Sequence, residues 1–116
     1  MKKVVVKKPW GEFVQFTHDE KSTVKILDVS PGEILSLQSH LKRAEYWYVL
    51  EGNPTMVIGE KTGKYKPGDS IRIGKRVKHR ISNKTMEKVR ILEISTGNFD
   101  EKDIIRYEDK YNRIKK

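Results

Sequence analysis

The sequence predicts an all-β protein that folds as a sandwich or a closed barrel in a single domain, 1–116. Short segments rich in β-branched and aromatic residues recur along the chain, and turn residues separate them. No stretch before the C-terminal tail repeats with the period of a helix. Short strands with brief connections are typical of sandwiches and barrels. The predicted strands are 12–17, 23–29, 34–38, 46–51, 55–58, 70–73, 79–82 and 89–95.

Turn-forming residues close these strands in chain order. Glycine, proline, asparagine and aspartate mark the strand ends because they accept the backbone angles of tight turns. After the last predicted strand, residues 98–111 are the only helix candidate, with Asp100 as its N-cap. The tail is therefore expected to be short and helical or irregular. The predicted turns are 30–32, 52–54, 61–63, 67–69 and Gly74.

Alternation along residues 45–51 assigns their side chains to two faces. Both faces are largely apolar, as expected where one lines a barrel and the other packs against a second sheet or a second copy of the chain. A homodimer is therefore expected, with packing inside one chain as the alternative. The two sets are Glu45, Trp47 and Val49 on one face, and Tyr46, Tyr48 and Leu50 on the other.

Composition excludes several classes of protein. The chain has no cysteine, which rules out disulfides and thiolate metal sites. No apolar run approaches the roughly 20 residues of a membrane span. The basic N-terminus is followed by an apolar run of only residues 4–6, too short for a signal peptide. We therefore expect a cytoplasmic protein with no membrane partner.

The net charge of +9 favours anionic partners, and a lysine-rich solvated surface is the alternative explanation. The basic residues are spread along the whole chain and follow no single helix face. Nucleic acid is therefore not expected as a partner.

Four side chains form a candidate metal site. Gln38 and His40 project to the same side of one strand, because residues i and i+2 share a face. A turn returns Glu45 on the adjoining strand, and His79 arrives from a later strand. Two imidazole nitrogens, one carboxylate oxygen and one amide oxygen suit Zn, Mn, Fe or Ni and leave a position for water or substrate.

The spacing around these residues resembles the two cupin motifs. The resemblance implies the cupin double-stranded β-helix, a jelly-roll barrel. It also implies a divalent metal ion at Gln38, His40, Glu45 and His79, with Zn expected first and Mn, Fe or Ni as alternatives. The two stretches read Gly32-x5-Gln38-x-His40-x4-Glu45-x6-Gly52 and Gly68-x5-Gly74-x-Arg76-x2-His79-x3-Asn83.

A closer resemblance, over about residues 8–113, is to the type II mannose-6-phosphate isomerase domain. That domain usually forms the C-terminal part of the bifunctional mannose-1-phosphate guanylyltransferase/mannose-6-phosphate isomerase. The resemblance implies interconversion of mannose 6-phosphate and fructose 6-phosphate, in nucleotide-sugar and polysaccharide biosynthesis, with a sugar phosphate as partner. Guanylyl transfer is not expected from these residues. The segments that carry the resemblance are 8–11, 35–40, 43–47, 67–71, 78–80 and 103–109.

An isomerase needs a base and a cationic clamp for the phosphate. Glu45 and Arg43 are expected to be catalytic, and the base is Glu45 itself, a metal-bound hydroxide, or a tyrosine or lysine at the barrel mouth. Arg43 is the first candidate for the phosphate, with Lys42 beside it in the turn between two ligand strands. Arg80 and Arg76 are weaker candidates, and alternation turns Arg80 away from the face of His79.

The chain also departs from the family pattern. Leu41, Lys42 and Tyr46 occupy positions where the family commonly has histidine. The alternative function is therefore a cupin that binds a sugar, a sugar phosphate or another small anion without turnover.

Overall fold

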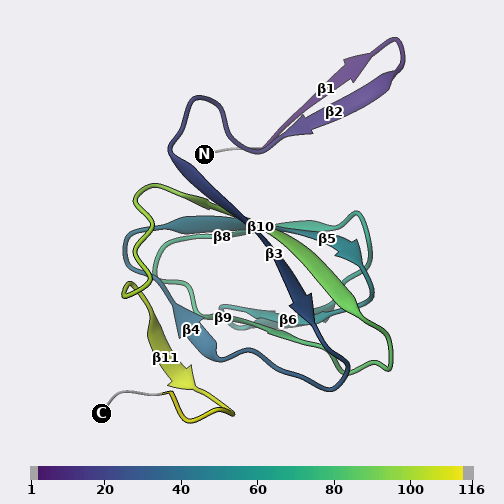
Figure 1. Ribbon diagram of the computed structural model, residues 1–116. Helices are drawn as coiled ribbons and strands as arrows, with labels where there is room; N and C mark the ends of the chain where they lie inside the picture. The colour runs from purple at the N-terminus through teal and green to yellow at the C-terminus, as the bar shows by residue number, and fades with distance from the viewer. Residues whose placement is uncertain (1–2, 114–116) are drawn as a thin grey trace.

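The computed structural model describes residues 3–113 and confirms an all-β protein (Figure 1). These residues form no helix, so the described part of the chain contains no helical membrane span. The strands are β1 Val4–Lys8, β2 Gly11–Gln15, β3 Ser22–Val29, β4 Leu37–Ser39, β5 Ala44–Glu51, β6 Thr55–Ile58, β7 Lys61–Lys64, β8 Ser70–Ile73, β9 His79–Ser82, β10 Val89–Thr96 and β11 Ile105–Glu108.

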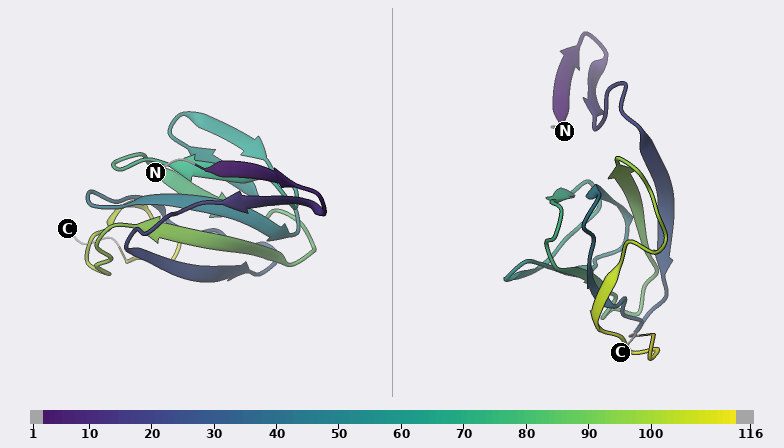
Figure 2. Two further views of the ribbon diagram at one scale, coloured as in Figure 1. Left: turned by 90° about the horizontal axis from the view of Figure 1, so that it is seen from above. Right: turned by 90° about the vertical axis from the view of Figure 1, so that its left-hand side faces the viewer.

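Two antiparallel sheets face each other and enclose the core (Figures 1 and 2). One sheet has the strand order β3-β10-β5-β8, and the other has the order β11-β4-β9-β6-β7. The buried side chains between them are apolar and come from both sheets, so burial of this surface holds the two layers together. They include Trp47 and Val49 of β5, Met56 of β6, Ile81 of β9 and Ile91 of β10.

The inward-facing rows of β5 and β10 change from apolar to polar along their length. In β10 the inward residue Ile91 is followed by Glu93 and then Ser95, and all three are buried. On the neighbouring strand β5, Glu45 lies opposite Ser95 of β10, and Trp47 lies opposite Glu93 of β10. One end of the barrel is therefore filled by apolar side chains, whereas the other end holds buried polar groups that need partners.

All eight predicted strands have a counterpart in the structure. The strand expected at 34–38 is shifted: β4 covers Leu37–Ser39, and Ile34 forms an isolated bridge with Ser82. The strands β1, β7 and β11 were not predicted. β7 has the sequence Lys-Thr-Gly-Lys and forms because β6 offers it a hairpin partner, not because its residues favour strands.

The helix predicted over 98–111 is wrong. Residues from this range form β11, which pairs antiparallel with β4. Asp100 does not cap a helix: its carboxylate accepts a hydrogen bond from the N–H of Lys102, and its carbonyl accepts one from the N–H of Asp103, which closes a turn. Pairing with a free sheet edge outweighs local helix propensity here.

The first two strands form a hairpin that projects away from the barrel (Figures 1 and 2). Their register pairs Val5 with Val14 and Val6 with Phe13. At the base of the hairpin, the ring of Phe16 packs against the rings of Tyr46 and Tyr48, at centroid distances of 5.3 and 6.0 Å.

Candidate metal centre

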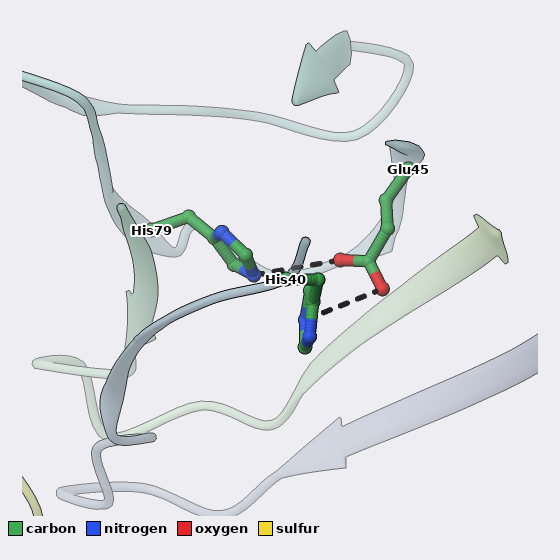
Figure 3. Close-up of side chains that lie close together, drawn as sticks. All are labelled: His40, Glu45 and His79. Atoms are coloured by element: carbon green, nitrogen blue, oxygen red, sulfur yellow. Dashed lines mark ion pairs between the residues drawn. The ribbon is translucent and has the colours of Figure 1, made fainter. Parts of the chain in front are cut away.

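Three of the four predicted ligands converge at the polar end of the barrel (Figure 3). His40 follows β4, Glu45 lies in β5 and His79 begins β9. All three are buried, and one ligand atom from each lies within 4.8 Å of the others. The Nε2 atom of His79 is 3.5 Å from Oε1 of Glu45, and the Nε2 atom of His40 is 3.8 Å from Oε2 of the same carboxylate.

Backbone carbonyls fix the orientation of both imidazoles. Nδ1 of His40 lies 2.7 Å from the carbonyl oxygen of Asp103, and Nδ1 of His79 lies 2.8 Å from that of Val77. A carbonyl oxygen can only accept, so each Nδ1 carries the proton and donates it. In the neutral rings each Nε2 is then an acceptor: that of His79 faces Oε1 of Glu45, and that of His40 accepts from Nη2 of Arg43 at 3.2 Å and lies 3.8 Å from Oε2 of Glu45. This arrangement is characteristic of histidines that bind metals.

Burial sets the charge states of these groups. It lowers the pKa of His79 to about 4 and also lowers the pKa of His40, although the bond to the Asp103 carbonyl opposes the second shift. Both imidazoles are therefore neutral near pH 7. Burial raises the pKa of Glu45, and the positive charge of Arg43 opposes that rise.

Two buried acceptor atoms at the centre have no hydrogen-bond partner. They are Oε1 of Glu45 and Nε2 of His79, which face each other. Two lone pairs in this arrangement repel unless a positive charge lies between them, and a separation of 3.5 Å is long for a shared proton. A divalent cation would satisfy both atoms. The nitrogen and oxygen donors fit Zn, Mn, Fe or Ni, so the residues present suit the predicted cofactor.

Gln38, the fourth predicted ligand, lies beside this cluster. The register of β4 and β9 places it directly opposite His79, and directly opposite residues share a face of the sheet. Its side chain is half-buried. A role for Gln38 as a ligand remains a prediction.

Arg43 lies inside the barrel beside the ligands. Its Nε donates to Oε2 of Glu45 at 3.2 Å, and its Nη2 lies 3.2 Å from Nε2 of His40. Its guanidinium also packs 4.3 Å from the centroid of the Phe99 ring. Ser95 donates a further hydrogen bond to Oε2 of Glu45 at 3.1 Å. One oxygen of the carboxylate is thus held by two donors while the other is free of them.

The remaining predicted phosphate-binding residues occupy different surroundings. Lys42 is exposed, next to the buried Arg43, and its backbone N–H donates to Asp103. Arg80 donates through Nε to the carbonyl of Leu35 at 3.0 Å, and its Nη1 pairs with Glu108 at 3.5 Å. These partners hold the Arg80 side chain away from the centre, as alternation predicted.

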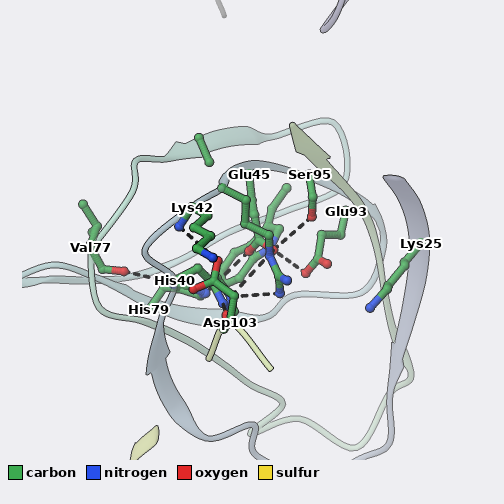
Figure 4. A network of polar contacts seen from close by, with 12 residues as sticks. Lys25, His40, Lys42, Glu45, Val77, His79, Glu93, Ser95 and Asp103 are labelled. Carbon is green, nitrogen blue, oxygen red and sulfur yellow. Dashed lines mark hydrogen bonds and ion pairs between the residues drawn. The ribbon is translucent and has the colours of Figure 1, made fainter. Parts of the chain in front are cut away.

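Three residues at the centre were not predicted (Figure 4). Glu93 is buried, accepts a hydrogen bond from Nε1 of Trp47 at 3.3 Å, and has its pKa raised to about 7 by burial and by the nearby Glu45. Lys25 extends from β3 toward this network. The carboxylate of Asp103 accepts the N–H groups of Leu41 and Lys42 at 2.9 and 3.0 Å.

The sequence contained a signal for two of these three residues. Glu93 stands in the inward row of β10 between Ile91 and Ser95, where alternation places a charged group inside the barrel. Lys25 shares the inward row of β3 with Leu27 and Val29 and lies opposite Glu93, so alternation places it on the same face. Asp103 carries no such signal, because it reaches the centre from a segment whose place depends on the tertiary fold.

Solved structures with the same architecture include a double-stranded β-helix protein from Klebsiella pneumoniae and a cupin sugar phosphate isomerase from Silicibacter pomeroyi. The first has a TM-score of 0.67 and 18% identity, covering 93% of this chain and 84% of that one. The second has a TM-score of 0.64 and 18% identity, covering 82% and 71%. They confirm the cupin double-stranded β-helix fold.

Curated relatives are longer proteins. A mannose-1-phosphate guanylyltransferase 2 from Escherichia coli O157:H7 is 36% identical over 105 residues, which is 90% of this chain and 22% of the relative. The xanthan biosynthesis protein XanB of Xanthomonas campestris is 35% identical over 109 residues, 93% of this chain and 23% of the relative. The chain thus spans less than a quarter of their length. A model of the mannose-6-phosphate isomerase C-terminal family matches residues 1–109, and the chain therefore belongs to that family of cupin domains.

Proposed function

We propose that this chain is a metal-dependent sugar-phosphate isomerase that interconverts mannose 6-phosphate and fructose 6-phosphate. Membership of the family supports the class of enzyme. The observation that carries the proposal is the facing pair of unpartnered acceptors, Oε1 of Glu45 and Nε2 of His79, in a buried cluster with His40. Buried polar atoms without a hydrogen-bond partner are rare in folded proteins, and a cation between these two atoms would satisfy both.

In this proposal, His40, Glu45 and His79 hold the ion, with Gln38 as the fourth ligand. Aldose–ketose isomerisation moves a proton between C1 and C2, and negative charge develops on a substrate oxygen. A bound divalent ion supplies Lewis-acid stabilisation of that oxygen. The carbonyls of Asp103 and Val77 hold the two imidazoles in the tautomer that presents Nε2 to the centre.

Arg43 and Glu45 are the proposed catalytic residues. The Arg43 guanidinium is buried beside the carboxylate of Glu45, where low dielectric strengthens its field. It adds positive charge next to the developing oxyanion. Glu45 keeps one oxygen without a hydrogen-bond donor, and that oxygen faces the centre.

The substrate's phosphate needs cations that are open to solvent. Lys42 is exposed next to Arg43, and Lys25 extends toward the same network with a side chain that is 37% exposed. We assign the phosphate to these lysines, assisted by Arg43, and give Arg80 a structural role because its guanidinium is held by Leu35 and Glu108.

The test combines metal analysis with an isomerase assay. The purified chain, loaded with Zn²⁺ or Mn²⁺, is expected to bind one ion and to convert mannose 6-phosphate to fructose 6-phosphate. His79→Ala should lose both the ion and turnover. His18→Ala is the matched control, because His18 is an exposed histidine outside the cluster. Turnover that survives in His79→Ala would refute the proposed centre.

The same assay separates the isomerase from a binding module. The sequence departures at Leu41, Lys42 and Tyr46 favour a cupin that binds sugar phosphate without chemistry. A fully metallated chain that is thermally stabilised by mannose 6-phosphate but forms no product would overturn the isomerase and support this second function.

A further inference from the structure

Arg106 of β11 carries a buried donor that nothing in the described part of the chain satisfies. The side chain is half-buried, and its Nε atom is fully buried without a hydrogen-bond partner there. Two other arginines near β11 differ, because Arg80 pairs with Glu108 and Arg113 pairs with Asp109. A buried N–H of a charged group is costly to leave without an acceptor, so the position of Arg106 suits an acceptor supplied by a ligand.

Arg106 also lines a pocket of about 390 Å³ whose uncompensated charge is positive. The acid in its lining, Glu101, pairs with Lys25 at 3.6 Å, and Arg113 is neutralised by the ion pair named above. Arg106 and Lys102 have no carboxylate partner within the described residues. The pocket therefore suits an anion that can accept hydrogen bonds. Its lining residues are Glu101, Lys102, Ile104, Ile105, Arg106 and Arg113.

The strand register relates Arg106 to the metal centre. Arg106 lies opposite Gln38 of β4, and Gln38 lies opposite His79 of β9. Directly opposite residues share a face of a sheet, so these three side chains form one row across three strands. With neighbouring strands about 4.8 Å apart, the backbone of Arg106 stands roughly 10 Å from that of His79. The unpartnered guanidinium is thus on the face of the sheet that carries the proposed ligands.

The segment that lines the pocket also orients the centre. Asp103 stands between two of the lining residues, and its carbonyl accepts a hydrogen bond from Nδ1 of His40. Lys25, the partner of Glu101, extends toward the same polar network (Figure 4). The pocket is therefore connected to the centre through β4, through the segment around Asp103 and through Lys25.

We propose, building on the function proposed above, that Arg106 binds the phosphate group of mannose 6-phosphate. In this sugar the phosphate stands at the end remote from C1 and C2. A cation two strands away from His79 fits that end while the reacting carbons lie at the centre. An arginine fork also matches two phosphate oxygens at once, which a lysine ammonium does not. Arg106 therefore joins Lys25 and Lys42 as a cation for the phosphate and sets the preference for sugar phosphate over free sugar.

The first experiment compares the apparent affinities of two sugars by calorimetric titration of the full chain loaded with Zn²⁺. The wild type is expected to bind mannose 6-phosphate more tightly than mannose. Arg106→Met should weaken binding of mannose 6-phosphate by about 10–100-fold and leave the affinity for mannose unchanged, because only the phosphate loses a donor. Arg106→Lys should recover part of the loss. Arg90→Met is the control, because Arg90 lies outside the pocket and pairs with Asp28.

Metal content and urea unfolding of the same variants separate ligand binding from structural damage. Arg106→Met should keep its ion, and Arg106→Lys supplies the same comparison with a smaller loss should the methionine variant unfold. An Arg106→Met chain that retains the wild-type preference for mannose 6-phosphate, or that loses its ion, would overturn the role of Arg106. A wild type that shows the preference but no turnover, with the preference lost in Arg106→Met, would refute the isomerase and support the phosphate site.

Discussion

Replacing Glu93 with glutamine should make the stability of the metal-free chain less dependent on pH. Glu93 is buried at the polar end of the barrel, where it accepts a hydrogen bond from Nε1 of Trp47. Burial and the neighbouring Glu45 raise its pKa from an ordinary 4.5 to about 7. Glutamine has the same shape, retains a carbonyl oxygen for the Trp47 bond and cannot ionise.

The magnitude follows from the raised pKa. In the unfolded chain the carboxyl ionises near pH 4.5, but in the folded chain it stays protonated up to about pH 7. Its contribution to stability is thus fully present below pH 4.5 and is lost as the pH rises through 7. At about 1.4 kcal/mol for each tenfold change in the ionisation constant, the loss is at most about 3 kcal/mol. Glu93→Gln should match the wild type at pH 4 and exceed it by up to that amount at pH 8.

The assay is urea unfolding of both proteins between pH 4 and 8, with a chelator present throughout. All other groups are common to the two proteins, so the difference between the two stability curves reports the ionisation of residue 93 together with its coupling to Glu45. Glu51→Gln, at an exposed position of β5, serves as a control and should follow the wild-type curve. Parallel curves for Glu93→Gln and the wild type would show that Glu93 is ionised in the fold and that the reasoning is wrong.

Three further predictions concern single positions. Gly52→Ala should lower the free energy of unfolding in urea by about 3 kcal/mol or more, because the φ of Gly52 is +81° and a Cβ there would lie 2.3 Å from the carbonyl oxygen of Lys88. Gly32→Ala should lower it by only about 1–2 kcal/mol, because Gly32 has a φ of +80° but no atom near the added Cβ. Equal losses for the two variants would contradict the predicted clash at Gly52. Ile91→Ala should lower the free energy of unfolding by about 2–5 kcal/mol in the same assay, because Ile91 is fully buried and its removal leaves a cavity. A loss below about 1 kcal/mol would mean that neighbouring core side chains fill that cavity. Asp103→Asn should speed hydrogen exchange at the amide of Leu41 or of Lys42, because asparagine keeps only one of the two oxygens that accept these N–H groups. Unchanged exchange at both amides would refute the anchoring role of Asp103.

Residue spacing and the cupin resemblance were enough to predict that His40, Glu45 and His79 lie together. Gln38 and His40 share a face by alternation, and the predicted turn before Glu45 returns the chain beside them. The grouping of Glu45, Trp47 and Val49 on one face of β5 was also predicted, and all three are buried. These features depend on local periodicity and on the spacing of the two cupin motifs, both of which can be read from the sequence.

The position of Arg43 was only partly predicted. It was assigned to a turn at the mouth, yet it stands two residues before Glu45, and its side chain points to the same side and hydrogen-bonds that carboxylate. The i, i+2 relation that joined Gln38 to His40 would have placed it there. The tail was missed for a different reason, since β11 exists only because β4 has a free edge to receive it.

The contact between His40 and Asp103 bears on the order in which the molecule assembles. The two residues are 63 positions apart, and the later one supplies the carbonyl that orients the earlier imidazole. During synthesis both sheets can begin to pair before residue 103 has left the ribosome, because domains start folding from the N-terminal side. Until then the carbonyl that accepts from Nδ1 of His40 is missing. The orientation of the His40 ring thus depends on the connection between β10 and β11, the last strand connection in the described part of the chain.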